Sequence, residues 1–188
     1  VYSMDGDFSP ISEICKLAKK YRALTFLDEV HAVGIYGKRG AGVAEMQNVM
    51  NEIDILQGTL AKAFGLIGGY VAGKKDLIDF IRSFSSGFIF TTSLPPCIAA
   101  GAYNSIRHLK FSDTERKNML KNIQNLKLLL KKTNIPFIDN GSHIIPVIIG
   151  EPNLCKKTCQ ILLDDFKIYV QPINFPTVPK GSERLRIT

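Results

Sequence analysis

The residue most open to a chemical interpretation is Lys62, which lies in a run of small and apolar residues, GTLAKAFGLIGGY, at positions 58–70. An ammonium group in such surroundings must find partners or lose its proton. A nucleotide-triphosphate loop of the G-x-x-x-x-G-K-[ST] type is excluded, because Ala61 precedes the lysine and Ala63 follows it. A lysine after an apolar strand, with Thr59 three residues before it, indicates a Schiff-base amine beside a phosphate-binding hydroxyl. An ordinary loop lysine is the alternative.

A second candidate run is FLDEVHAVG at positions 26–34. Asp28 comes at the carboxyl end of an apolar strand, which is where open α/β sheets bind ligands. His31 follows three residues later, in a turn that leads into a glycine-rich segment. A carboxylate at the end of a buried strand needs a cationic or hydrogen-bonding partner. The alternative is that Asp28 or Glu29 caps a following turn and that His31 packs as a neutral side chain.

Asp28 and Lys62 together predict a site for pyridoxal phosphate. This cofactor needs a lysine for covalent attachment and an acid paired with its pyridinium nitrogen, and the two residues end successive predicted strands. Thr91 and Thr92, in the run FTTS before a proline-initiated helix, offer hydroxyls and a helix N-terminus to the phosphate. The alternative for these threonines is strand-end propensity alone.

The chain ends in RLRIT, where two arginines flank a leucine. The alternation of a strand places Arg184 and Arg186 on one face and Leu185 on the other. Arginine is well shaped for bidentate binding of a carboxylate, so this face is a candidate substrate site. Two arginines on a solvated strand face are the alternative.

Helical and strand-like patterns alternate through the first part of the chain. A helix is expected to start at Ser9 as N-cap with Pro10 as its first residue. The alternation of helices with short, apolar strands predicts an α/β layer with a parallel or mixed sheet. The expected strands are 23–30, 53–58 and 66–73, and the expected helices are 9–21, 74–84 and 95–109.

The pattern changes near residue 110, where a long lysine-rich helix begins. Leu120, Ile123, Leu126 and Leu130 recur on one face of it, and an Asn-Ile-Pro run at 134–136 breaks it. Strands at 143–150, 168–173 and 184–188, with a helix at 152–166, predict an α+β subdomain. We therefore expect residues 1–110 to be part of a cofactor-binding large domain and residues 111–188 to be part of a smaller C-terminal domain.

Composition excludes several other classes of protein. The net charge of +7 is spread over the whole chain, with no basic stripe, so we expect no nucleic-acid partner. No apolar run approaches the roughly 20 residues of a membrane span. Of the four cysteines only Cys155 and Cys159 are close, and the second pair that a zinc site requires is missing, so no metal is expected. The first residues lack the pattern of a signal peptide, and we expect the chain to be an internal fragment.

The longer motifs resemble a known family. The runs DEVHAVGIYGKRGAG, GTLAKAFG, GFIFTTSLPP and YVQPINFPTVPKGSERLRIT look like those of the α-oxoamine synthases, pyridoxal-phosphate enzymes of the aspartate-aminotransferase fold type. The resemblance extends from Val1 to Thr188. It implies a partial large domain with a mixed, mostly parallel sheet, followed by part of the small domain.

The resemblance also implies roles for the candidate cofactor residues. Lys62 would form the Schiff base with the cofactor and act as the catalytic base, and Asp28 would pair with the pyridinium nitrogen. His31 would hydrogen-bond the phenolic oxygen of the ring, and Thr59 would bind the phosphate. Thr91 would reach the phosphate of the cofactor in the other subunit, because sites in this family form between the subunits of a homodimer.

For the substrates, the resemblance implies that Arg186 binds the carboxylate of glycine. Thr177 would lie near the acyl-CoA, and Ser3 would lie near both cofactor and substrate. One position departs from the family pattern: Ala61 replaces the usual glycine before the lysine. If that position needs a positive φ or a close approach to the cofactor, alanine carries a cost.

Within the family, the motifs are most similar to those of the branch that condenses glycine with succinyl-CoA to give 5-aminolevulinate, CoA and carbon dioxide, the entry to haem synthesis. Sister branches of the 8-amino-7-oxononanoate synthase or 2-amino-3-ketobutyrate CoA ligase type are the alternative. The family's N-terminal half is absent from this sequence, so we expect the 188-residue chain alone to be inactive. The implied compartment is the mitochondrial matrix for a eukaryotic protein and the cytoplasm for a bacterial one.

Overall fold

The computed structural model describes all residues from Val1 to Thr188. The chain divides into two compact units, the first formed by residues 10–116 and the second by residues 1–9 together with 117–188. Each unit is described by itself below. No helix in either unit is both long enough and apolar enough to cross a membrane.

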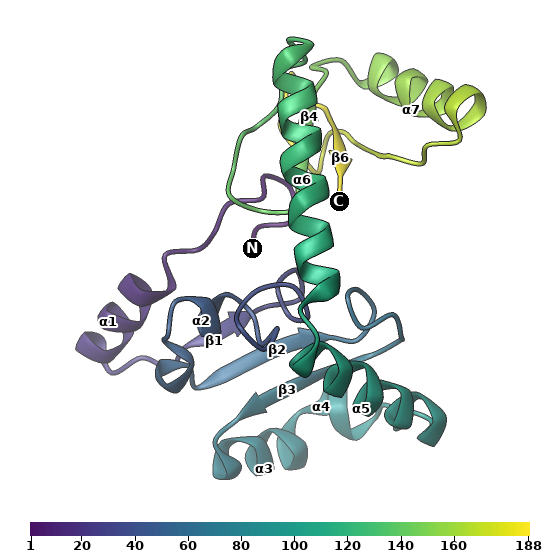
Figure 1. The fold of residues 1–188 in the computed structure, drawn as a ribbon. Helices are drawn as coiled ribbons and strands as arrows, with labels where there is room; N and C mark the ends of the chain where they lie inside the picture. Colours follow the sequence, from purple (N-terminus) through teal and green to yellow (C-terminus); the bar gives the residue numbers. More distant parts are fainter. The chain divides into compact units, whose positions relative to one another are not determined.

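A three-stranded sheet forms the centre of the first unit (Figure 1). Its strands lie in the order β1 (Phe26–Asp28), β2 (Ile55–Thr59) and β3 (Gly69–Gly73). Strands β1 and β2 run parallel, with Asp28 opposite Gln57, whereas β3 pairs with β2 in the antiparallel direction. The predicted α/β layer with a mixed sheet is confirmed.

Helices surround this sheet at the predicted positions, with small differences. Helix α1 begins at Ile11 instead of Pro10, because Pro10 has a ψ of 66° and stands outside the helix without a side-chain cap. Three elements of four residues or fewer were not predicted, because such lengths show no helical periodicity. The helical elements of this unit are α1 (Ile11–Tyr21), α2 (Val43–Met46), the 3-10 turn η1 (Met50–Glu52), α3 (Lys75–Phe84), α4 (Ser86–Ile89) and α5 (Pro96–Phe111).

The core of the first unit holds the loops that follow β1 and β2. Val33 comes from the first loop, Leu60 and Phe64 come from the second, and Ala102 and Leu109 come from α5. All five side chains are buried. The loop that carries Lys62 is therefore anchored by apolar contacts on both sides of the lysine.

The second unit is α+β, as predicted. Its antiparallel sheet has the strand order β4 (Ile145–Ile148), β6 (Arg184–Ile187), β5 (Gln171–Ile173). Helix α7 (Pro152–Phe166) begins after Glu151, whose carboxylate accepts hydrogen bonds from the backbone N–H groups of Asn153 and Leu154. Helix α6 (Thr114–Lys132) starts in the last residues of the first unit and continues into this one.

One face of α6 packs against this sheet. Leu130 is buried there with Val147 and Leu185, and Ile123 and Leu126 cover the same cluster in part. Leu120, which was predicted on this face, is 46% exposed. It lies one turn before Ile123, the first residue of the helix that packs against this core.

Candidate active site

The two predicted cofactor residues follow neighbouring strands at the same edge of the sheet. Asp28 is the last residue of β1, and Lys62 follows Thr59, the last residue of β2. Because β1 and β2 are parallel, their carboxyl ends lie together, as Figure 1 shows. The backbone N–H of Glu29 donates to the carbonyl of Gln57 at 2.9 Å and extends the pairing past the end of β1.

Asp28 is held in one orientation while remaining open to solvent. Its Oδ1 accepts a hydrogen bond from the backbone N–H of Val30 at 2.8 Å, and the residue is exposed. The turn-capping interpretation of Asp28 is therefore confirmed. This capping uses one oxygen, which leaves Oδ2 able to accept from a ligand.

Lys62 lies in a loop whose apolar neighbours turn away from it. Leu60 and Phe64 are 4% and 7% exposed, and the carbonyl of Phe64 accepts from the hydroxyl of Ser105 at 3.0 Å. Lys62 itself is exposed, so the residues that flank it in the sequence do not enclose its ammonium group. The flanking apolar side chains enter the core and leave the lysine on the outside of the loop.

Ala61 carries no backbone strain. Its φ lies outside the positive region, where the non-glycine residues are Arg22, Asn48, Asn134 and Lys167. The N–H of Ala61 donates to the hydroxyl oxygen of Thr59 at 3.1 Å, and that hydroxyl donates to the carbonyl of Gly68 at 3.2 Å. An alanine before the lysine is therefore accommodated, and the proposed phosphate ligand Thr59 helps to order the loop.

The loops after β1 and β2 meet at Gly34 and Ala63. Gly34 has a φ of +82°, and a Cβ at this position would lie 2.6 Å from the Cβ of Ala63. Real Cβ atoms do not approach so closely. Only glycine at position 34 thus lets the turn that contains His31 pack directly against the residue after Lys62.

Gly34→Ala is therefore expected to displace the lysine loop. The positive φ costs roughly 1–2 kcal/mol, and the contact with Ala63 adds a further overpacking cost of about 1–3 kcal/mol. Gly65→Ala is the matched control, because Gly65 has a φ of +70° with nothing within 4 Å of the added Cβ. Denaturant unfolding of the full-length variants should show the larger loss for Gly34→Ala, and equal losses would contradict the packing argument.

Glu29 is a buried acid that the sequence did not single out as a site residue. It is 1% exposed, its Oε1 accepts from the N–H of Ala44 at 2.7 Å, and its Oε2 is buried with no hydrogen-bond partner. Burial raises the pKa of Glu29. Burial also raises the pKa of Tyr70, and the Glu29 carboxylate adds to that rise. Glu29 thus caps the start of α2 and ties the turn after Asp28 to it.

The pH dependence of stability should reveal the buried acid. The folded protein keeps a proton on Glu29 that the unfolded chain releases near pH 4.5, so stability falls as the pH rises from 4.5 toward the raised pKa. Glu29→Gln should abolish this fall while keeping an acceptor for Ala44. Glu29→Ala should cost about 1–3 kcal/mol, because the N–H of Ala44 loses its partner.

Glu45→Gln is the control for this titration. Burial raises the pKa of Glu45, but hydrogen bonds from Arg39 and Ala41 outweigh it and the net pKa is lowered. Its stabilising contribution is present above pH 4.5 and is lost as the pH falls through the lowered pKa. Urea unfolding between pH 3 and pH 8 should show that Glu29→Gln removes a loss of stability at rising pH, whereas Glu45→Gln removes a loss at falling pH. The same pH dependence of stability in both variants would contradict the assignment.

The remaining predicted cofactor residues occupy different positions. His31 is half-buried in the turn between Asp28 and Gly34, where the N–H groups of Ala32 and Val33 donate to the carbonyl of Glu29. Thr91 and Thr92 are exposed between α4 and α5. The Thr91 hydroxyl donates to the carbonyl of Gly87 at 2.5 Å, so within this chain it is bound to the preceding turn.

The three predicted substrate residues all belong to the second unit. Nη1 of Arg186 donates to the carbonyl of Ser3 at 3.4 Å, so these two predicted residues lie together. Thr177 is exposed in the loop between β5 and β6, where its N–H donates to the carbonyl of Asn174. The prediction that Arg184 and Arg186 share a face opposite Leu185 is confirmed, since Leu185 lies in the core while both arginines contact residues 3–5.

Comparison with known proteins places the chain in a family. The model of the family Aminotransferase class I and II matches residues 1–188, so the chain belongs to this family. Among curated proteins it is 59% identical over 188 residues to the 5-aminolevulinate synthase of Rhizobium meliloti and 56% identical over 190 residues to that of Rhodobacter capsulatus. In each case the aligned region covers the whole of this chain and 46% of the relative.

Solved structures agree with this assignment of fold. A serine palmitoyltransferase from Sphingomonas wittichii matches all of the chain with a TM-score of 0.94 and 32% identity, over 47% of its own length. An 8-amino-7-oxononanoate synthase from Francisella tularensis matches with a TM-score of 0.84 and 26% identity, over 54% of its length. The chain thus spans about half the length of the relatives it matches.

Proposed function

We propose that the full-length protein is a 5-aminolevulinate synthase, which condenses glycine with succinyl-CoA and releases CoA and carbon dioxide. The observation that carries the proposal is a pair of exposed groups, Asp28 and Lys62, at one sheet edge of a chain that is 59% identical over its whole length to such an enzyme. The resemblance of the motifs in the sequence supports the same assignment.

The groups at this edge fit pyridoxal phosphate by their chemistry. The cofactor needs an acid for its ring nitrogen, an amine for its aldehyde and donors for its phosphate. Asp28 has a free oxygen and Lys62 has an exposed amine. The Thr59 hydroxyl, at the end of the adjacent strand, donates to the carbonyl of Gly68 and would exchange this acceptor for the phosphate. One matching solved structure is SPT with its PLP internal aldimine, and another is a serine palmitoyltransferase with a bound PLP–myriocin aldimine, which supports the same cofactor here.

When bound, this cofactor acts as an electron sink for the bond that is broken at the α-carbon of an amino acid. Asp28 would keep the ring nitrogen protonated, and the neighbouring His31 would hold the phenolic oxygen. Lys62 would bind the aldehyde covalently and, once released, its Nζ would take the α-proton of glycine. Arg186 would pair with the carboxylate of glycine, and Thr177 would lie near the acyl-CoA.

We further propose that the full-length protein acts as a homodimer. Thr91 and Thr92 are exposed on a segment between two helices. The Thr91 hydroxyl donates to the carbonyl of Gly87 and would exchange this acceptor for the phosphate of a cofactor in a second subunit. The relatives named above are bacterial, which favours the cytoplasm of a bacterial cell as the compartment. Sedimentation of the full-length protein would test the assembly.

The substrate assignment is tested by assaying the full-length protein with glycine and a series of acyl-CoA thioesters. Succinyl-CoA should give the highest kcat/KM, with 5-aminolevulinate as product. The second candidate, a sister α-oxoamine synthase, is favoured by the structural match to 8-amino-7-oxononanoate synthase. Preference for acetyl-CoA or a longer acyl chain, or for alanine over glycine, would support that candidate and overturn the first.

A further inference from the structure

The two arginines on one face of β6 differ in how many of their hydrogen-bond donors the protein already binds. The Arg184 side chain is 6% exposed, and its Nη1 lies 2.6 Å from Oδ1 of Asp5. The same Nη1 donates to the carbonyl of Met4 at 3.3 Å, and Nε donates to the carbonyl of Ser182 at 2.9 Å. A buried guanidinium with these partners has its charge neutralised and its position fixed.

Arg186, by contrast, keeps donors for a ligand. Its one protein contact is a hydrogen bond of 3.4 Å from Nη1 to the carbonyl of Ser3, and its Nε is buried with no partner. A buried donor without an acceptor is costly unless a ligand completes it. Of the two arginines, Arg186 is therefore the one able to bind a carboxylate, and its orientation depends on where Ser3 lies.

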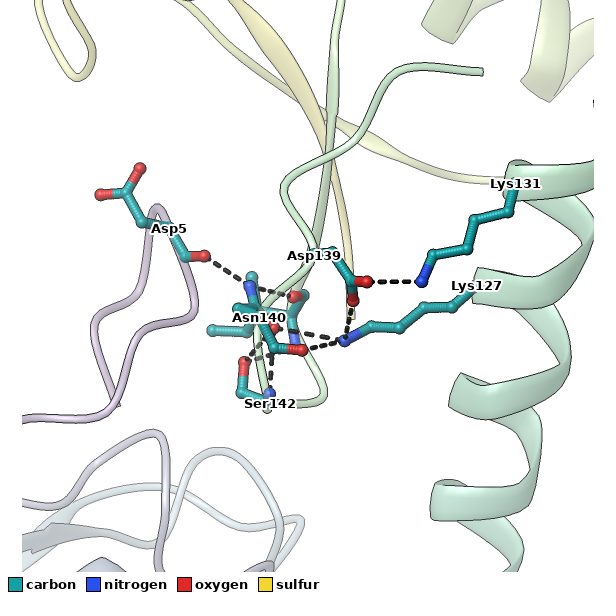
Figure 2. A network of polar contacts seen from close by, with 7 residues as sticks. Asp5, Lys127, Lys131, Asp139, Asn140 and Ser142 are labelled. Atoms are coloured by element: carbon teal, nitrogen blue, oxygen red, sulfur yellow. Dashed lines mark hydrogen bonds and ion pairs between the residues drawn. The ribbon is translucent and has the colours of Figure 1, made fainter. Parts of the chain in front are cut away.

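The segment that carries Ser3 is held at a second point. The side-chain amide of Asn140 donates to the carbonyl of Asp5 at 2.5 Å, a contact that Figure 2 shows. Gly6 follows with a φ of +79°, and a Cβ there would lie 2.2 Å from Nδ2 of Asn140. The N–H of Gly6 donates to the carbonyl of Tyr2, so the segment forms a closed turn.

We propose that Arg184 and Asp5 are positioning residues that hold the carbonyl of Ser3 in place, and that this carbonyl orients Arg186 for the α-carboxylate of the amino-acid substrate. Arg184 is not assigned to the substrate, because its side chain is buried and its Nη1 and Nε already bind Asp5, Met4 and Ser182. It fixes Met4 and Asp5, and thereby the carbonyl of Ser3 that orients Arg186. This inference rests on the proposed function, in which Arg186 binds glycine.

The test compares Arg184→Met with Lys131→Met in the full-length protein. The two side chains make ion pairs of the same length in the same unit, since Nζ of Lys131 lies 2.6 Å from Oδ2 of Asp139. No contact joins Lys131 to residues 3–5, so Lys131→Met is the control for the loss of an ion pair in this unit, at a side chain that is 58% exposed. We expect Arg184→Met to raise the KM for glycine at least 10-fold and to change kcat and the KM for succinyl-CoA less than 3-fold. Lys131→Met should leave all three constants unchanged.

Hydrogen exchange gives a readout independent of activity. The amides of Tyr2 and Gly6, which are hydrogen-bonded within the turn, should exchange at least 10-fold faster in Arg184→Met and unchanged in Lys131→Met. Arg184→Lys, which keeps the charge, should restore part of the glycine affinity. Because Arg184→Met could fail to fold, Asp5→Asn serves as a second variant with the same selective effect on glycine in smaller degree.

Unchanged glycine KM in folded Arg184→Met and Asp5→Asn, or an equal rise in both KM values, would overturn the inference. If the proposed function itself is wrong, the assay gives a different result. In that case the unsubstituted full-length protein would itself show no glycine-dependent release of CoA from succinyl-CoA. The exchange comparison at Tyr2 and Gly6 would still test whether Arg184 orders the segment.

Discussion

Lys62→Ala in the full-length protein is expected to lower kcat by at least about 10³-fold, because the substitution removes both the covalent ligand of the cofactor and the base for the α-proton. The loop itself should survive. Leu60 and Phe64 anchor it in the core, whereas the lysine side chain is exposed and contributes little to packing. The unfolding midpoint of the variant without cofactor should therefore stay close to that of the unsubstituted protein.

Borohydride reduction followed by peptide mapping tests directly which residue binds the cofactor. After cofactor is added, the reduced pyridoxyl group should be found on Lys62 of the unsubstituted protein and on no residue of Lys62→Ala. Lys75→Ala is the matched control, since Lys75 is also an exposed lysine of the first unit and begins α3. Label on another lysine, or substantial activity in Lys62→Ala, would remove the basis of the proposed mechanism.

The arrangement of Asp28 and Lys62 could be predicted because it depends on local patterns. Apolar runs of strand length located β1 and β2, and the alternation of such strands with helices along the chain indicated an α/β sheet that binds ligands at the carboxyl ends of its strands. The exposure of Lys62 could not be obtained in this way. Composition shows that its neighbours are apolar, but which side of the loop meets α5 is decided by tertiary contacts such as that of Phe64 with Ser105.

Long-range contacts account for the other residues that sequence reasoning missed. The sequence predicted Glu29 only as an alternative cap of the turn after β1, and its contact with Ala44, 15 residues away, could not be predicted. Asp5 and Arg184 are 179 residues apart in the chain. No periodicity links such positions. Thus residues 1–9 group with residues 117–188 in one compact unit, although the sequence predicted one division near residue 110. The domain boundaries of the full-length protein stay a prediction.

Asp28→Asn separates the charge of Asp28 from its structural role. Asparagine keeps an oxygen that can accept from the N–H of Val30, so the turn after β1 should persist. What is lost is the negative charge that would hold a proton on the ring nitrogen of the cofactor. We expect kcat/KM for glycine to fall about 100-fold or more, equivalent to ~2.7 kcal/mol of transition-state stabilisation.

Three comparisons make this result specific to the charge. Cofactor should still attach to Lys62 in Asp28→Asn, which borohydride labelling would detect. Asp28→Ala should lose activity to a similar degree and also lose about 1 kcal/mol of stability, because Val30 loses its acceptor. Asp79→Asn, at an exposed aspartate of α3, should leave activity unchanged. If Asp28→Asn kept more than half of the activity, the cofactor would not depend on this acid, and the role of the β1 edge would have to be assigned to another residue.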